Sequence, residues 1–198
     1  MNAQLPPPPD SGVRPLRALL VYESMFGNTE LVASAVATGL RREGVEVTTF
    51  EVNDAPAHDA APAHDLLVVG APTHAFSLSR HATREDAVRQ GAEPARAETG
   101  LREWIDTMST TDHGIRLAAC FDTRVTKVRR LPKAASTRAA HLLRRHGATL
   151  VDRPSGFLVH DTQGPLEPDE LARAEDWGAR LAEQVKARLA VTTAPEHH

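Results

Sequence analysis

The chain has one cysteine, Cys120, and few aromatic residues: Phe, Trp and Tyr make up 4% of its 198 residues. A lone cysteine excludes an internal disulfide and a zinc site built on cysteine ligands, and it fits a reducing compartment. No apolar run approaches the ~20 residues that span a bilayer. Residues 1–15 lack the basic start and apolar core of a secretory signal. We therefore expect a cytoplasmic protein without a membrane partner.

The charges of the chain nearly balance, with a formal net charge of −3. This leaves no basic excess of the kind that general nucleic-acid binding needs, so we expect no nucleic-acid partner. Proline is concentrated at the start of the chain. We expect residues 1–15 to be a disordered, proline-rich arm, residues 16–191 to form one domain, and residues 192–198 to form a flexible tail.

Short apolar runs alternate with helical periodicities along the chain. The expected strands cover residues 18–22, 45–50, 66–70, 115–121 and 148–151, with 156–159 as a candidate continuation of the last. This alternation predicts an α/β fold with a doubly wound, five-stranded parallel sheet, for which the order 2-1-3-4-5 fits. Ligands bind such sheets beyond the carboxyl ends of strands one and three, which here means after Tyr22 and Gly70.

The segment Ser24–Thr29 follows the first strand and opens the first helix. Backbone N–H groups at a helix start have no partners within the helix, and the helix dipole adds partial positive charge there. Gly27 permits a positive φ or the close approach of a ligand. The segment has no lysine, which excludes a nucleoside-triphosphate P-loop. It predicts a site for a phosphate monoester, with a plain helix cap at Asn28 or Thr29 as the alternative.

This segment resembles the FMN phosphate loop of the flavodoxin family, which has the form Ser/Thr-x-x-Gly-Asn-Thr after the first strand. The resemblance implies a flavodoxin-like fold and a non-covalently bound FMN. The implied phosphate contacts are Ser24, Met25, Phe26, Gly27, Asn28 and Thr29.

The same resemblance implies that the loops after strands three and four hold the flavin ring. The implied contacts are Pro72, Thr73, His74, Phe76, Phe121, Asp122, Thr123 and Arg124. Phe76 is the expected stacking partner, and His74 is expected to touch the ring edge-on. No aromatic residue occurs over residues 122–131, unlike in typical flavodoxins, and this predicts weaker flavin binding. Arg124 and Lys127 place cations where flavodoxins avoid them, which predicts a raised reduction potential. The alternative for Arg124 is a solvated surface arginine.

Two segments carry charge with no assigned role. Residues 77–99 are a polar insertion after the third strand, interpreted either as an excursion over the ligand site or as a plain surface insertion. Residues 123–151 contain basic but no acidic side chains. This run predicts a docking surface for an acidic redox protein or a grip on a pyridine nucleotide phosphate, with a solvated helix face as the alternative.

A doubled Ala-Pro-Ala-His-Asp pattern precedes the third strand and brings together His58, Asp59, His64 and Asp65. We interpret it as a connector and assign no metal site.

These features favour an FMN-binding electron-transfer protein of the flavodoxin type. Two alternatives remain open: an FMN-dependent NAD(P)H:quinone-type reductase, and a flavin-free binding or regulatory module with the same fold. No residue is assigned a catalytic role, so the sequence leaves open whether the protein is an enzyme.

Overall fold

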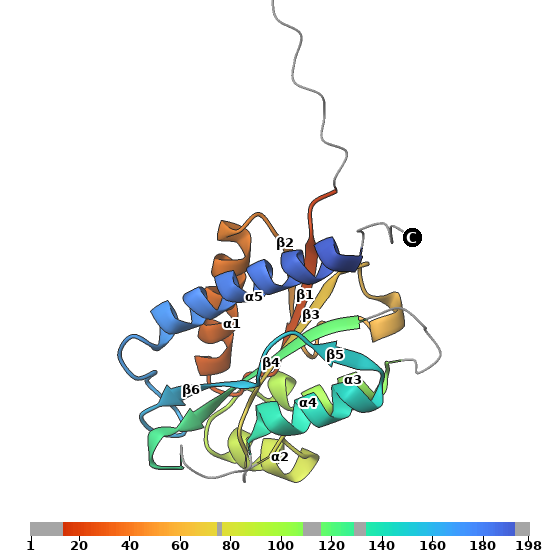
Figure 1. The fold of residues 1–198 in the computed structure, drawn as a ribbon. Helices are drawn as coiled ribbons and strands as arrows, with labels where there is room; N and C mark the ends of the chain where they lie inside the picture. The colour runs from red at the N-terminus through yellow and green to blue at the C-terminus, as the bar shows by residue number, and fades with distance from the viewer. Residues whose placement is uncertain (1–13, 75–76, 109–115, 129–133, 193–198) are drawn as a thin grey trace, which may run out of the picture.

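The structure is a computed structural model that describes residues 14–74, 77–108, 116–128 and 134–192 (Figure 1). Most of the expected arm and tail lies outside these residues, so both segments stay predictions. None of the helices in the described ranges is long and apolar enough to cross a membrane.

The described residues contain a parallel sheet made of β1 (Arg17–Tyr22), β2 (Glu46–Glu51), β3 (Leu66–Pro72), β4 (Arg116–Val125), β5 (Ala148–Leu150) and β6 (Ser155–Val159). The strand order is β2-β1-β3-β4-β5, with β6 also paired to β4. Nearly every residue of β1 and β3 is buried, as expected for central strands covered on both faces. The predicted doubly wound sheet with order 2-1-3-4-5 is confirmed, and β6 is an additional strand.

Two successive short strands pair with one edge of β4. Its first residues pair with β5, and Phe121–Val125 pair with β6. The sequence-based end of this strand at Phe121, followed by a loop, is wrong, because β6 supplies hydrogen-bond partners that extend β4 to Val125. The side chains of residues 121–125 therefore alternate between the two faces of the sheet.

The helices are α1 (Asn28–Arg42), α2 (His81–Arg89), α3 (Leu101–Asp106), α4 (Ala135–Arg145) and α5 (Glu170–Thr192). Helices α1 and α5 cover one face of the sheet, and α3 and α4 cover the other (Figure 1). Strand side chains alternate accordingly. Leu20 and Val68 join the core beneath α1 and α5, whereas Leu19 and Val69 join the core beneath α3 and α4. Single 3-10 turns occur at His58–Ala60, Pro94–Ala97 and Thr126–Val128.

Two glycines let α1 and α5 pack backbone against backbone. A Cβ added to Gly39 would lie 1.9 Å from the carbonyl oxygen of Glu175, and one added to Gly178 would lie 2.2 Å from that of Val36. No other residue type permits so close an approach without moving a helix. The position of α1, and of the loop that opens it, therefore depends on α5.

We expect Gly39→Ala to lower the free energy of unfolding by about 2 kcal/mol, although alanine is the better helix former. The added methyl group must displace α5 and loosen the core beneath it. Denaturant unfolding followed by circular dichroism measures the change. Ser34→Ala, at an exposed position of the same helix, is the control and should have little effect. Equal stability of the two variants would contradict the close backbone contact.

Candidate functional site

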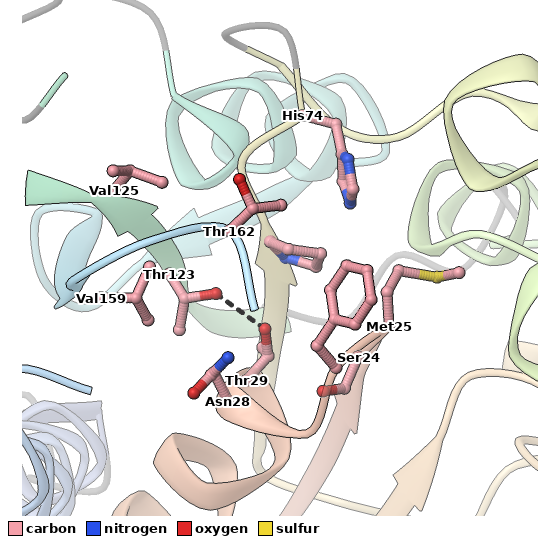
Figure 2. A pocket seen from close by; sticks show the side chains of 11 residues that line it. Ser24, Met25, Asn28, Thr29, His74, Thr123, Val125, Val159 and Thr162 are labelled. Carbon is pink, nitrogen blue, oxygen red and sulfur yellow. Dashed lines mark hydrogen bonds between the residues drawn. The ribbon is translucent and has the colours of Figure 1, made fainter. Parts of the chain in front are cut away.

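A pocket opens at the carboxyl ends of the central strands, where α1 begins (Figure 2). The empty space at this place, counted together with the open solvent at its mouth, is about 400 Å³. The lining residues come from the β1–α1 loop, the end of β3, the end of β4, and β6 with the loop after it. They are Ser24, Met25, Phe26, Asn28, Thr29, Pro72, His74, Thr123, Val125, Val159 and Thr162.

The loop between β1 and α1 is fixed by a serine and a glycine. The Ser24 hydroxyl oxygen accepts hydrogen bonds from the N–H groups of Gly27 at 3.1 Å and Glu30 at 3.3 Å. Gly27 has a φ of 86°, in the left-handed region that favours glycine. Gly27 is thus the N-cap residue of α1, and the hydroxyl of Ser24, rather than that of Thr29 or the amide of Asn28, accepts an N–H group of the first turn.

The first N–H groups of α1 point toward the pocket end of the helix. Within the described ranges, the N–H groups of Asn28 and Thr29 have no hydrogen-bond acceptor in the protein. The helix dipole adds partial positive charge at this end. Unpartnered donors and a helix amino terminus together form a phosphate-binding arrangement that needs no lysine.

Thr29 ties the start of α1 to β4. Its hydroxyl lies 2.8 Å from the hydroxyl of Thr123, and both residues are buried (Figure 2). Each hydroxyl can still donate or accept one further bond, since a hydroxyl has one hydrogen and two lone pairs. The pair therefore joins the phosphate loop to the strand expected to border the flavin ring.

The last residue of β3, Pro72, and His74 in the loop after it line the pocket, and Thr73 between them supports the loop from outside. The Thr73 N–H donates to the carbonyl oxygen of Thr123 at 2.8 Å, and the Thr73 hydroxyl accepts from the N–H of Ala135 at 3.0 Å. The side chain of Thr73 thus caps α4. Phe76, the expected stacking residue, lies outside the described residues.

His74 is half-buried in the wall of the pocket. Its Nε2 atom is buried and has no hydrogen-bond partner in the described protein. Burial, together with the positive charge of Arg84, lowers the pKa of His74 below its usual value. The imidazole is therefore neutral near pH 7, and its buried Nε2 atom is left without a partner beside the pocket.

Three other residues implied for the flavin ring lie outside the pocket lining. Phe121 packs in the core against Phe157 and Trp177, with ring centroids 6.0 and 6.1 Å away. Its ring occupies the space left by Gly70, where an added Cβ would lie 2.0 Å from the Phe121 ring. Gly70 is thus needed for this packing.

Asp122 and Arg124 pair with each other on the opposite face of β4 from Thr123. The guanidinium donates through Nε and Nη2 to the two carboxylate oxygens, each at 2.6 Å. Asp122 is fully buried and also accepts from the N–H and hydroxyl groups of Ser136 in the first turn of α4. Arg124 is therefore neither a solvated surface arginine nor free to move, and its flavin contact stays a prediction.

The sequence-based prediction omitted Val125, Val159 and Thr162. Val125 was accessible to sequence reasoning, because it alternates with Thr123 along an extended strand. Val159 and Thr162 enter through β6 and its following loop, which passes close to α1 because Gly164 leaves room for Asn28. An added Cβ there would lie 2.5 Å from the Asn28 amide oxygen.

The insertion after β3 is ordered from residue 77 to 99 and packs beside the phosphate loop. Arg96 donates to the carbonyl oxygen of Ser24 and to Glu30, both at 3.0 Å. Met25 packs in an apolar cluster with Ala87 and Ala92 of this insertion. The insertion therefore supports the loop from the side.

A buried ion cluster holds the insertion in place. Arg84, 1% exposed, donates to Ser79, to the carbonyl oxygen of Ala97 and to Glu103. Glu23, directly before Ser24, is also fully buried and accepts from the N–H of Leu101 at 2.9 Å. Burial raises the pKa of Glu23 above its usual value.

No group of three or more acidic, histidine or cysteine side chains suited to a metal ion occurs in the parts of the chain that the structure describes. In the doubled pattern, the ring of His58 lies edge-on to those of His64 and Trp104. His58 therefore packs among other rings beside α3.

Residues 20–79 match the model of the flavodoxin family. The structure is similar to that of a flavodoxin from the domain Archaea, with a TM-score of 0.60 and 20% identity, covering 86% of this chain and 99% of that one. Oxidised flavodoxin 1 from Bacillus cereus gives a TM-score of 0.60 at 19% identity, covering 84% of this chain and 97% of that one. The flavodiiron protein from Giardia intestinalis gives 0.58 at 17% identity, covering 90% of this chain and 38% of that one.

The sheet order and the loop at its carboxyl edge define an α/β protein of the flavodoxin class. The match over residues 20–79 includes the loop that opens α1, so the chain is similar to flavodoxins in this loop as well as in its fold. Proteins of the flavodoxin family generally bind FMN.

We expect Asp122→Ala to lower the free energy of unfolding by about 3 kcal/mol, because it leaves Arg124 and the start of α4 without their acceptor. Asp106→Ala is the control, since that carboxylate is 60% exposed and lies 3.8 Å from His146. Thermal and denaturant unfolding measure both changes. A loss no larger than that of the control would show that the buried pair contributes little.

Proposed function

We propose that the protein binds FMN non-covalently in this pocket and transfers electrons through it. The observation that carries the proposal is the amino terminus of α1, where Asn28 and Thr29 direct unpartnered N–H groups to the pocket. FMN ends in a phosphate monoester, the group that such a helix start binds with neutral donors.

The remaining lining fits the rest of FMN in its chemistry. Away from the start of α1, the pocket is lined by apolar and hydroxyl side chains, including Pro72, Thr123 and Val125. His74 adds a buried ring nitrogen without a partner. FMN, when bound, supplies reversible one- and two-electron redox chemistry, and the protein binds it, orients it and sets its charge environment.

The sharpest test places a negative charge where the phosphate should lie, without damaging the helix. In Asn28→Asp, the new carboxylate sits in the first turn of α1, where acidic residues stabilise a helix. We expect FMN affinity to fall about tenfold or more through charge repulsion, while the stability of the protein is kept. Fluorescence titration of the apoprotein with FMN measures the affinity, and unfolding measures the stability.

Two controls make the FMN test specific for the phosphate. Ser34→Asp adds the same charge to an exposed position on α1 and should leave FMN affinity nearly unchanged. Riboflavin lacks the phosphate, so its affinity should be nearly equal in Asn28→Asp and in the wild-type protein. Absence of FMN binding by the wild-type protein, or equal loss of riboflavin and FMN, would refute the phosphate site.

We further propose that the electron partner is an acidic redox protein that docks on α4. The outward side of this helix presents Arg138, His141, Arg144 and Arg145 with no acidic side chain. The start of α4 is tied to Thr73 in the loop beside the pocket. A basic face that begins beside the pocket and extends along α4 steers an acidic protein toward the place where electrons leave.

A pyridine nucleotide donor remains the other candidate partner. A cytoplasmic location stays a prediction from the single cysteine.

We expect Arg145→Glu to slow electron transfer to a small acidic cytochrome about tenfold at low salt, and to remove most of its salt dependence. Arg180→Glu on α5 is the matched control, because Arg180 is exposed on the other face of the sheet. Stopped-flow reoxidation of the reduced holoprotein measures the rates. Equal slowing by both variants, or faster reaction of the wild type with a small basic cytochrome than with an acidic one of similar potential, would contradict this docking face.

A further inference from the structure

His74 is the one pocket-lining residue in the described ranges whose side chain titrates near neutral pH. It follows β3 and is held by paired backbone hydrogen bonds with Ser77, each of 2.9 Å. Figure 2 shows its ring extending from this loop into the pocket, on the side of Met25. The buried Nε2 atom has no acceptor or donor among the described groups. The backbone at His74 is therefore held, while Nε2 of its ring has no partner among the described groups.

The surroundings of His74 all favour the loss of its proton. Burial and the guanidinium of Arg84 both lower the pKa of the imidazole. The other lining residues of the described pocket, from the β1–α1 loop, α1, β4, β6 and the loop after β6, are uncharged. The ionisable groups on the neighbouring elements are paired with each other: Arg84 with Glu103, and Arg96 with Glu30 and Glu93. The buried Glu23 lies on the Arg84 side of the phosphate loop.

We propose that His74 takes up a proton at Nε2 when the bound flavin is reduced, so that this histidine couples electron transfer to proton uptake. This inference rests on the proposed FMN site. In this role, the protonated imidazole of His74 neutralises negative charge on the reduced flavin ring.

An external reductant, dithionite in the experiment below, delivers two electrons. One proton from water goes to the ring, which leaves the reduced ring with one negative charge more than the oxidised ring. A second proton from water binds Nε2 of a neutral His74 that carries its first hydrogen on Nδ1. The site thus takes up two electrons and two protons, and its charge is the same before and after reduction.

A new negative charge in this pocket favours the protonated imidazole because the surroundings are partly buried and screen it weakly. We expect the proton affinity of His74 to rise at least about tenfold on reduction. Arg84 lowers the proton affinity of His74 in the oxidised and in the reduced state alike. Its effect therefore cancels in the difference between the two states.

The direct test is a pH titration of the histidine NMR signals in the FMN-loaded protein, oxidised and then reduced with dithionite. The chain has ten histidines, and the signal missing from His74→Gln assigns His74. We expect the His74 midpoint to move upward by at least one pH unit on reduction. A His74 midpoint that is the same in both states would overturn the proposal.

A second readout is the pH dependence of the reduction potential. Each proton taken up with two electrons changes the equilibrium tenfold per pH unit, which is about 30 mV per pH unit. Between the two midpoints of His74, we expect the wild-type slope to exceed that of His74→Gln by this amount. His64→Gln, at the opposite end of β3 from His74, should match the wild type. Equal slopes for all three proteins would refute the coupling. Failure of the wild-type protein to bind FMN would instead remove the proposed function itself, so the two failures are distinguishable.

Discussion

The site depends on the position of one helix end, the amino terminus of α1. Ser24 holds two N–H groups of the turn, Gly27 bends the chain into the left-handed region, and the next two N–H groups are left for a ligand. Close packing on α5, which Gly39 and Gly178 permit, fixes the direction of the helix. The dipole of α1 therefore points at the pocket because of contacts on the far side of the helix.

Around this helix end, the described protein pairs its charged side chains with each other outside the pocket. Asp122 and Arg124 neutralise each other beneath α4, and Arg84 and Glu103 do so under the insertion after β3. Neither pair contributes a charged side chain to the pocket lining. A phosphate and a flavin would thus meet backbone dipoles, hydroxyl groups and one neutral histidine, His74. In such surroundings a change of charge on the ring acts most strongly on the one group there that can titrate.

Much of the fold followed from the sequence, because central parallel strands are continuous apolar runs and Gly and Pro mark their ends. The loop that opens α1 was predictable for a similar reason: its glycine and its hydroxyl side chains lie within six consecutive residues after a recognisable strand. The partners of Asp122 and Arg124 were not predictable. Their side of the sheet depends on pairing between β4 and β6, which lie thirty residues apart, and a boundary error at Phe121 hides the alternation. Thr162 enters the pocket only through the path of the loop after β6, which local sequence does not encode.

The central claim is that the free N–H groups of Asn28 and Thr29 bind the phosphate of FMN. Amide NMR spectra of the labelled apoprotein, recorded during titration with FMN and with riboflavin, test this most directly. The account predicts large shifts of these two amide signals with FMN, and much smaller ones with riboflavin at equal saturation. Binding of FMN that leaves both signals unmoved would contradict it.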